Sequence, residues 1–133
     1  MGIRTIRRVA LTYLALLTLL LLVRNPLALI RQVPPLLDAF LTVSAVTHLM
    51  TFTVLAFLML ASRWPVPGWR LFAYLAAYAC ATEGLQYFFP PRKMELVDVI
   101  QDLLGLALGA VLWSAVEWWQ SASSSAPGCE SSK

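Results

Sequence analysis

Long apolar stretches separated by short polar or proline-containing breaks are the main feature of this chain. The apolar stretches occupy residues 9–23, 43–61, 69–89 and 96–119. A helix needs about 20 apolar residues to cross the hydrocarbon layer of a bilayer. The first stretch is short, but the side chains of Arg8 and Arg24 at its ends can reach toward the interface and lengthen it. The pattern predicts an all-α membrane protein, a compact bundle of four transmembrane helices.

The breaks between the stretches predict short connections. Asn25-Pro26 ends the first predicted helix and Pro34-Pro35 precedes the second, because proline interrupts a helix. The other two breaks, at residues 63–68 and 89–92, also contain prolines. Residues 121–133 are rich in serine and are predicted to be a disordered tail, so the helical domain is expected to span residues 1–120.

The basic residues flank the apolar stretches and are interpreted as topology signals. One side of the membrane would carry Arg4, Arg7, Arg8, Arg63 and Arg70, and the other Arg24, Arg31, Arg92 and Lys93. This bias favours both termini in the cytoplasm of a multi-pass cell-membrane protein. The basic start also fits a cleaved signal peptide, but Arg24-Asn25-Pro26-Leu27 offers no small residues for cleavage, so the first helix is interpreted as retained.

Composition agrees with a membrane location. Hydrophobic residues make up 59% of the 133 residues and charged residues 13%, against about 45–50% and about 25% in soluble domains. With a mean hydropathy of +0.72, this excludes an ordinary soluble domain, a disordered chain and a nucleic-acid-binding module, despite a net charge of +3. Cys80 lies in an apolar stretch and Cys129 in the tail, so the two predict no disulfide framework.

Polar and ionisable residues gather at one end of the predicted bundle. They are His48 near the start of the second helix, Glu83 and Gln86 near the end of the third, Arg92 in the next connection, and Asp98 and Asp102 at the start of the fourth. In a bundle whose helices run alternately up and down, these positions share one side. Because an ionisable residue in hydrocarbon costs at least about 2.5–3.5 kcal/mol, the six are ligand-binding candidates.

Helical spacing turns these residues inward. On the third predicted helix Ala79 and Glu83 share a face, and on the fourth Asp102, Gly105 and Gly109 do. Gly105 and Gly109 form a G-x-x-x-G motif, which favours close packing of helix backbones. We expect the third and fourth helices to approach closely at these glycines, with the polar residues just above the contact.

Simpler structural roles are open for each candidate. Asp98 and Asp102 can complement the dipole at the start of a helix. Arg92 can anchor at phosphate headgroups, His48 can be a hydrogen-bonded packing residue, and Glu83 can pair with Arg92. The spacing of these residues matches no metal-ligand motif, and the sequence indicates no cofactor.

Residues 83–109 also carry a longer pattern. The pattern is Glu-x-x-Gln, then an aromatic residue and Pro before Arg, then an acid three residues after the Arg, and finally Asp and paired glycines. The residues that match it are Glu83, Gln86, Pro90, Arg92, Glu95, Asp98, Gly105 and Gly109. This block resembles the VanZ-like family of small integral membrane proteins. An earlier family element, Asp-Lys-x-x-His followed by aromatic residues, matches at His48 and Phe52, whereas Ser44 and Ala45 replace its Asp and Lys. In the later block, Asp102 replaces a usual Asn.

The resemblance implies a cell-envelope protein, and the founding member of the family is linked to low-level resistance to the glycopeptide teicoplanin. It implies membrane lipids as partners, with a cell-wall precursor or a glycopeptide as further candidates. The residues predict no nucleic-acid partner and leave the oligomeric state open.

Three functions compete at this point. The first is binding of a polar headgroup or wall precursor, with Arg92 pairing with an anionic group. The second is an intramembrane enzyme acting on a lipid or lipid-linked substrate, with Glu83 and His48 as acid and base. The third is transport or proton relay by an oligomer. No activated nucleophile accompanies the lone His48, so a binding role is favoured over an enzyme.

Overall fold

Four helices make up the described part of the chain. The structure, a computed structural model, describes residues 2–22, 37–87 and 96–124, without the side chains of residues 22, 37–45, 86 and 87. The helices are α1 (Ile3–Leu22), α2 (Leu37–Ala61), α3 (Gly68–Tyr87) and α4 (Leu96–Ser124). The predicted all-α architecture with four helices is confirmed. The proline pairs expected at residues 25–26 and 34–35 lie outside the described residues.

The helices do not stop where the apolar stretches do. Helix α1 begins at Ile3, ahead of the apolar residues, and includes three arginines. Helix α4 continues through Ser124, so the expectation of disorder from residue 121 onward needs correction at its start. The hydroxyl of Ser121 donates to the carbonyl of Glu117 at 3.0 Å, and that of Ser123 to Trp119 at 2.9 Å. Serines that bond back to the preceding turn are compatible with a helix.

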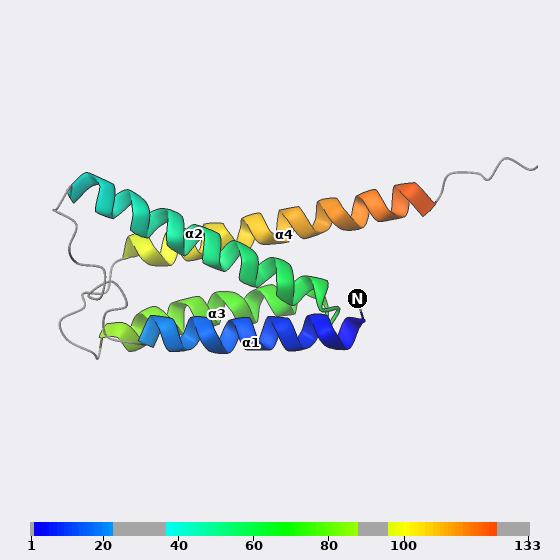
Figure 1. The fold of residues 1–133 in the computed structure, drawn as a ribbon, viewed down its shortest axis with the longest axis horizontal. Coiled ribbons are helices and arrows are strands. Elements are labelled where there is room, and N and C mark those ends of the chain that lie inside the picture. The colour runs from blue at the N-terminus through cyan, green and yellow to red at the C-terminus, as the bar shows by residue number, and fades with distance from the viewer. Residues whose placement is uncertain (1, 23–36, 88–95, 125–133) are drawn as a thin grey trace, which may run out of the picture.

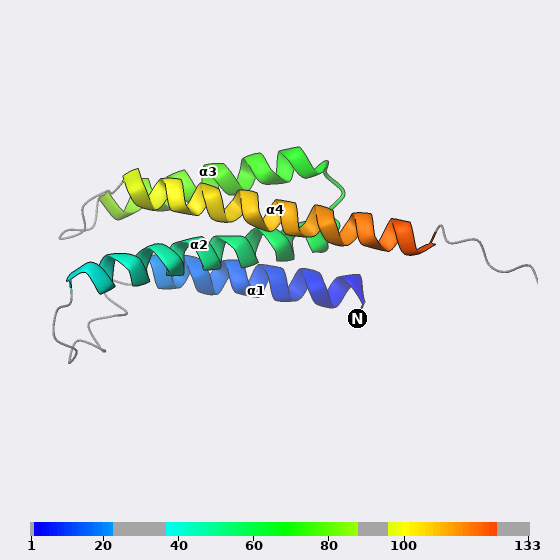
Figure 2. The same ribbon diagram turned by 90° about the horizontal axis from the view of Figure 1, so that it is seen from above.

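Successive helices run in opposite directions, so each end of the molecule collects alternate helix ends (Figure 1). Helix α2 packs most extensively against α4, and α1 lies beside α2 and α3. The last turns of α4 project past the other three helices in both views (Figures 1 and 2). The start of α2, the end of α3 and the start of α4 therefore meet at one end, which is the arrangement the sequence predicted for the polar residues.

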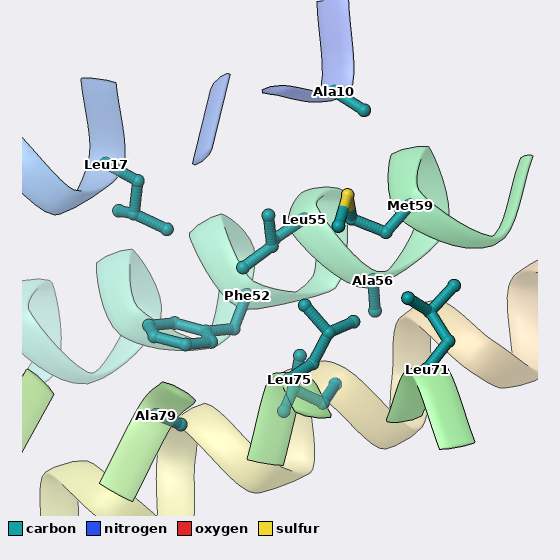
Figure 3. Packing of buried hydrophobic residues seen from close by; sticks show 10 residues of the cluster. Ala10, Leu17, Phe52, Leu55, Ala56, Met59, Leu71, Leu75 and Ala79 are labelled. Carbon is teal, nitrogen blue, oxygen red and sulfur yellow. The ribbon is translucent and has the colours of Figure 1, made fainter. Parts of the chain in front are cut away.

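Helix α2 supplies the centre of the core. Its residues Phe52, Leu55, Ala56 and Met59 lie between Ala10 and Leu17 of α1 and Leu71, Leu75 and Ala79 of α3 (Figure 3), and Leu106 of α4 completes the cluster. Two hydrogen bonds add to this packing: the Tyr13 hydroxyl donates to the Thr51 carbonyl at 3.1 Å, and the Thr18 and Tyr78 hydroxyls share a bond of 2.8 Å. The core thus joins all four helices.

The glycine pair lies against a different helix from the one expected. A Cβ added to Gly105 would come within 2.5 Å of the Leu49 carbonyl oxygen, and one added to Gly109 would meet the Thr53 carbonyl oxygen and lie 2.7 Å from the Ala56 Cβ. Both neighbours belong to α2, so the close backbone contact joins α2 to α4. Helices α3 and α4 also pack against each other, but the expectation that the glycines face α3 was wrong, because the spacing of glycines marks a close approach without identifying the partner helix.

The outer faces of α1 and α4 are apolar. Exposed side chains include Leu16 and Leu19 on α1 and Leu104 and Val111 on α4, with Leu19 and Val111 61% and 64% exposed. Within the described residues, α4 alone has the length and apolar composition to cross a membrane, and α2 contributes the shorter apolar segment Val46–Ala61.

Candidate functional site

A histidine–carboxylate pair joins α2 to α4 at the polar end of the bundle. His48 Nδ1 and Asp102 Oδ1 lie 2.9 Å apart and are hydrogen-bonded. The Asp102 side chain is 2% exposed and that of His48 is 18% exposed. An ionised carboxylate only accepts, so Nδ1 carries the proton and Nε2 is the acceptor of the neutral imidazole. Asp102 therefore fixes both the orientation and the tautomer of His48.

Close packing just below the pair holds the two side chains opposite each other. Leu49, whose carbonyl oxygen meets Gly105, directly follows His48, and Asp102 stands one turn before Gly105 on α4. Phe52, one turn after His48, is fully buried. Because the backbones of α2 and α4 are in contact here, the short side chains of His48 and Asp102 can span the gap.

Two further acids surround the pair. Glu83, near the end of α3, is 2% exposed, and Asp98 lies in the first turn of α4. The charges of Glu83, Asp98 and Asp102 all act on the His48 imidazole. The structure thus brings together four sequence-predicted candidates: His48, Glu83, Asp98 and Asp102. As an acid-rich site, they suit a ligand that presents hydroxyl, amide or amine donors.

Two candidates are not placed by the structure. Arg92 lies outside the described residues, and for Gln86 only the backbone, within α3, is described. Their contribution to the site stays a prediction from the sequence.

Two further residues at this end were not among the sequence-predicted site candidates. The Tyr78 hydroxyl bonds to Thr18, and Tyr78 interacts electrostatically with Asp102, which links α1 to the site. The signal was a hydroxyl-bearing aromatic residue in an apolar stretch, just over one turn before Glu83. The Oε1 atom of Gln101 is buried without a hydrogen-bond partner among the described residues. A buried acceptor of this kind is costly to leave unpaired, which makes Gln101 a further candidate ligand contact.

The described residues contain no group of three or more His, Cys, Asp or Glu side chains that could hold a metal ion. The described side chains form an oriented imidazole among carboxylates. Such a site can accept hydrogen bonds from a bound headgroup, or it can move a proton at His48 Nε2.

Comparison with known proteins covers nearly the whole chain. Residues 5–117 match the profile of a family described as VanZ/LLP1. The match spans all four helices and both members of the His48–Asp102 pair, and it confirms the resemblance drawn from residues 83–109. No curated protein and no solved structure matches the chain.

Proposed function

Since the chain belongs to the VanZ/LLP1 family, we propose that it is a multi-pass envelope membrane protein that binds the polar headgroup of a lipid or of a lipid-linked cell-wall precursor. The observation that carries the proposal is the His48–Asp102 pair, 2.9 Å apart and turned into the bundle. Buried ionisable residues are rare among apolar helices and mark functional sites there. The apolar outer faces of α1 and α4 support placing this bundle in a bilayer.

The acids define what the site recognises. Glu83 and Asp102 are buried, and Asp98 lies one turn above Asp102. Carboxylates accept hydrogen bonds, so the ligand contributes hydroxyl, amide or amine donors, which sugars and peptides supply. Arg92, expected from the sequence at the same end, would pair with an anionic group of the ligand such as a phosphate.

Binding can be measured on the full chain in nanodiscs. The probe is a fluorescent wall precursor, a disaccharide-pentapeptide linked through diphosphate to a lipid. Asp102→Asn keeps the size of the side chain but removes its charge, so we expect binding to weaken at least about tenfold. Gln120→Ala alters an exposed polar residue of the same helix and should bind as the unaltered chain does. Equal affinity of Asp102→Asn and the unaltered chain would rule out this site.

The same geometry favours a second function, an acid–base enzyme acting on the bound lipid. Asp102 holds the imidazole so that Nε2 can take a proton from water or from a substrate hydroxyl. The sequence paired His48 with Glu83 for this role, and the hydrogen bond to Asp102 adds the orienting group. His48→Gln and Glu83→Gln would then lower turnover of a lipid-linked substrate by about 10²–10⁴, measured at saturating substrate so that any loss of binding does not contribute. Turnover that survives both changes argues for binding alone.

The family resemblance also extends the proposal to glycopeptide stress. If the ligand is a wall precursor, deletion of the chain lowers the teicoplanin concentration that stops growth, and re-expression restores it. Asp102→Asn should fail to restore it, whereas Gln120→Ala should succeed. Restoration by both variants would show that any effect on resistance does not depend on the polar site.

A further inference from the structure

A second site lies at the other end of the bundle from His48. In the described part of the chain, a cavity of about 490 Å³ opens where the turn between α2 and α3 faces the middle of α4. Its lining includes Trp64, Trp69, Trp113, Arg63 and Glu117. On α4, Asp102 and Glu117 are separated by roughly 22 Å of helix at 1.5 Å per residue, so this cavity is distinct from the polar site.

Indole rings attract cations at this end of the molecule. The guanidinium of Arg7 lies 5.0 Å from the centre of the Trp64 ring, and that of Arg70 lies 5.2 Å from the centre of the Trp69 ring. Trp113 is held by an edge-on contact with Phe57, with ring centres 5.7 Å apart. Tryptophan faces bind ammonium groups best among the aromatic side chains. An arginine already stacks on each of Trp64 and Trp69, and Trp69, which is 69% exposed, keeps ring surface accessible to a further cation.

The cavity also carries one charge of each sign. Arg63 and Glu117 are both exposed, and no ion pair joins them in the described structure. The Nε1 atom of Trp64 is buried and has no hydrogen-bond partner among the described residues. Arg63 and the indole N–H are donors suited to phosphate oxygens, whereas Glu117 suits an ammonium group.

The turn that presents Arg63 is held in an unusual conformation. Arg63 has a φ of 45°, in the left-handed region that normally takes glycine after a helix. Arg7 stabilises this conformation, since its Nε donates to the Ser62 carbonyl at 3.0 Å and its Nη2 donates to the Arg63 carbonyl at 2.7 Å. A bulky residue kept in a strained turn and fixed from another helix is typical of a functional position.

We propose that this cavity binds the headgroup of a zwitterionic phospholipid, with the phosphodiester at Arg63 and the ammonium group between the indole rings and Glu117. Trp64 lies in the turn after α2 and Trp69 at the start of α3, positions where indole rings favour the bilayer interface. The inference goes beyond the proposed function, because it uses the membrane location but not the site at His48 and Asp102.

The test uses the full chain in nanodiscs of phosphatidylglycerol that contain a minor fraction of phosphatidylethanolamine, with retained lipids counted by native mass spectrometry. The unaltered chain should retain phosphatidylethanolamine in preference to phosphatidylglycerol. Arg63→Gln and Glu117→Gln alter exposed side chains, so the fold should survive, and each should lower that preference by roughly five- to tenfold. Arg8→Gln, the same change at an exposed arginine of α1, should retain the preference.

Equal retention of the two lipids by the unaltered chain, or an unchanged preference in both Arg63→Gln and Glu117→Gln, would overturn the proposal. Soluble glycerophosphoethanolamine distinguishes the source of the ligand. If this soluble compound displaces the bound lipid, the site recognises the headgroup alone. If it does not displace the lipid, and Arg63→Gln abolishes lipid retention, the site recognises the whole membrane lipid. Asp102→Asn separates this site from the proposed function, because lipid preference should persist when binding of the wall precursor is lost.

Discussion

His48 Nδ1 and Asp102 Oδ1 meet at 2.9 Å although 54 positions separate the two residues in the chain. The contact crosses the most extensive helix interface of the molecule, between α2 and α4. A hydrogen bond in such a position has two roles that can be measured separately. It contributes to the stability of the interface, and it orients the imidazole for a ligand or a proton.

The stabilising role predicts energetic coupling between the two side chains. His48→Gln, Asp102→Asn and the double variant form a cycle, and we expect a coupling free energy of about 1 kcal/mol, the scale of hydrogen bonds between membrane helices. The measurement is unfolding of the purified chain in mixed micelles. A coupling free energy of zero would show that the hydrogen bond does not stabilise the fold.

Alanine at either glycine of the α2–α4 contact should destabilise the bundle. The added methyl group would press against the Leu49 carbonyl oxygen in Gly105→Ala, and against the Thr53 carbonyl oxygen in Gly109→Ala. Carbonyl groups inside a helix cannot move aside, so we expect a loss of about 1–3 kcal/mol in the free energy of unfolding for each variant. Thermal unfolding followed by circular dichroism measures the loss.

Gly84 supplies the matched control. It also lies within a helix, but no atom of the described residues lies within 4 Å of the Cβ that alanine would add. Because alanine favours helix over glycine, Gly84→Ala should be neutral or more stable by up to about 1 kcal/mol. If all three alanine variants behaved alike, the close contact with α2 could not be the cause.

The Arg7 side chain should stabilise the fold by bonding to the turn that follows α2. It makes two hydrogen bonds to carbonyls at the end of α2 and stacks on Trp64. Carbonyls at the end of a helix have no partner within the helix, so the removal of the guanidinium leaves them unpaired. Arg7→Gln should lower the free energy of unfolding by about 1–3 kcal/mol. Arg8→Gln makes the same change at an exposed neighbour and should leave stability within about 0.5 kcal/mol.

The orientation expected from the basic residues can be tested with single cysteines. In a chain with Cys80→Ser and Cys129→Ser, Glu95→Cys places a thiol just before α4, and Gln120→Cys places one near its end. The helix from Leu96 to Gln120 is about 36 Å long at 1.5 Å per residue, enough to cross a bilayer. If both termini are cytoplasmic, an impermeant maleimide labels Glu95→Cys in intact cells and labels Gln120→Cys only after lysis. The reverse pattern would turn the His48 site toward the cytoplasm.

The sequence predicted the number of helices and the gathering of His48, Glu83, Asp98 and Asp102 at one end. Both follow from apolar stretches and short breaks, which are local properties. The pairing of His48 with Asp102 was not predicted, since choosing among three nearby acids requires the rotation of each helix about its axis. For the same reason the glycines were assigned to the wrong neighbouring helix.

The remaining differences also have physical causes. Arg7 was interpreted only as a topology signal, because sequence alone does not reveal that its guanidinium reaches the carbonyls of Ser62 and Arg63. Tyr78 was not singled out, because its hydroxyl matters through Thr18, which is 60 positions away. The serines after Trp119 were taken as a sign of disorder, although their hydroxyls bond within α4.

The contact of Gly105 and Gly109 with α2 fixes the rotation of α4 about its own axis, and with it the direction in which Asp102 points. A single residue inserted between Asp102 and Gly105 would leave the glycines in place but rotate Asp102 by about 100° around α4, away from His48. Homologous chains can therefore vary the outer faces of these helices freely, whereas the three-residue interval from acid to glycine has to keep its length wherever the histidine–acid pair is used.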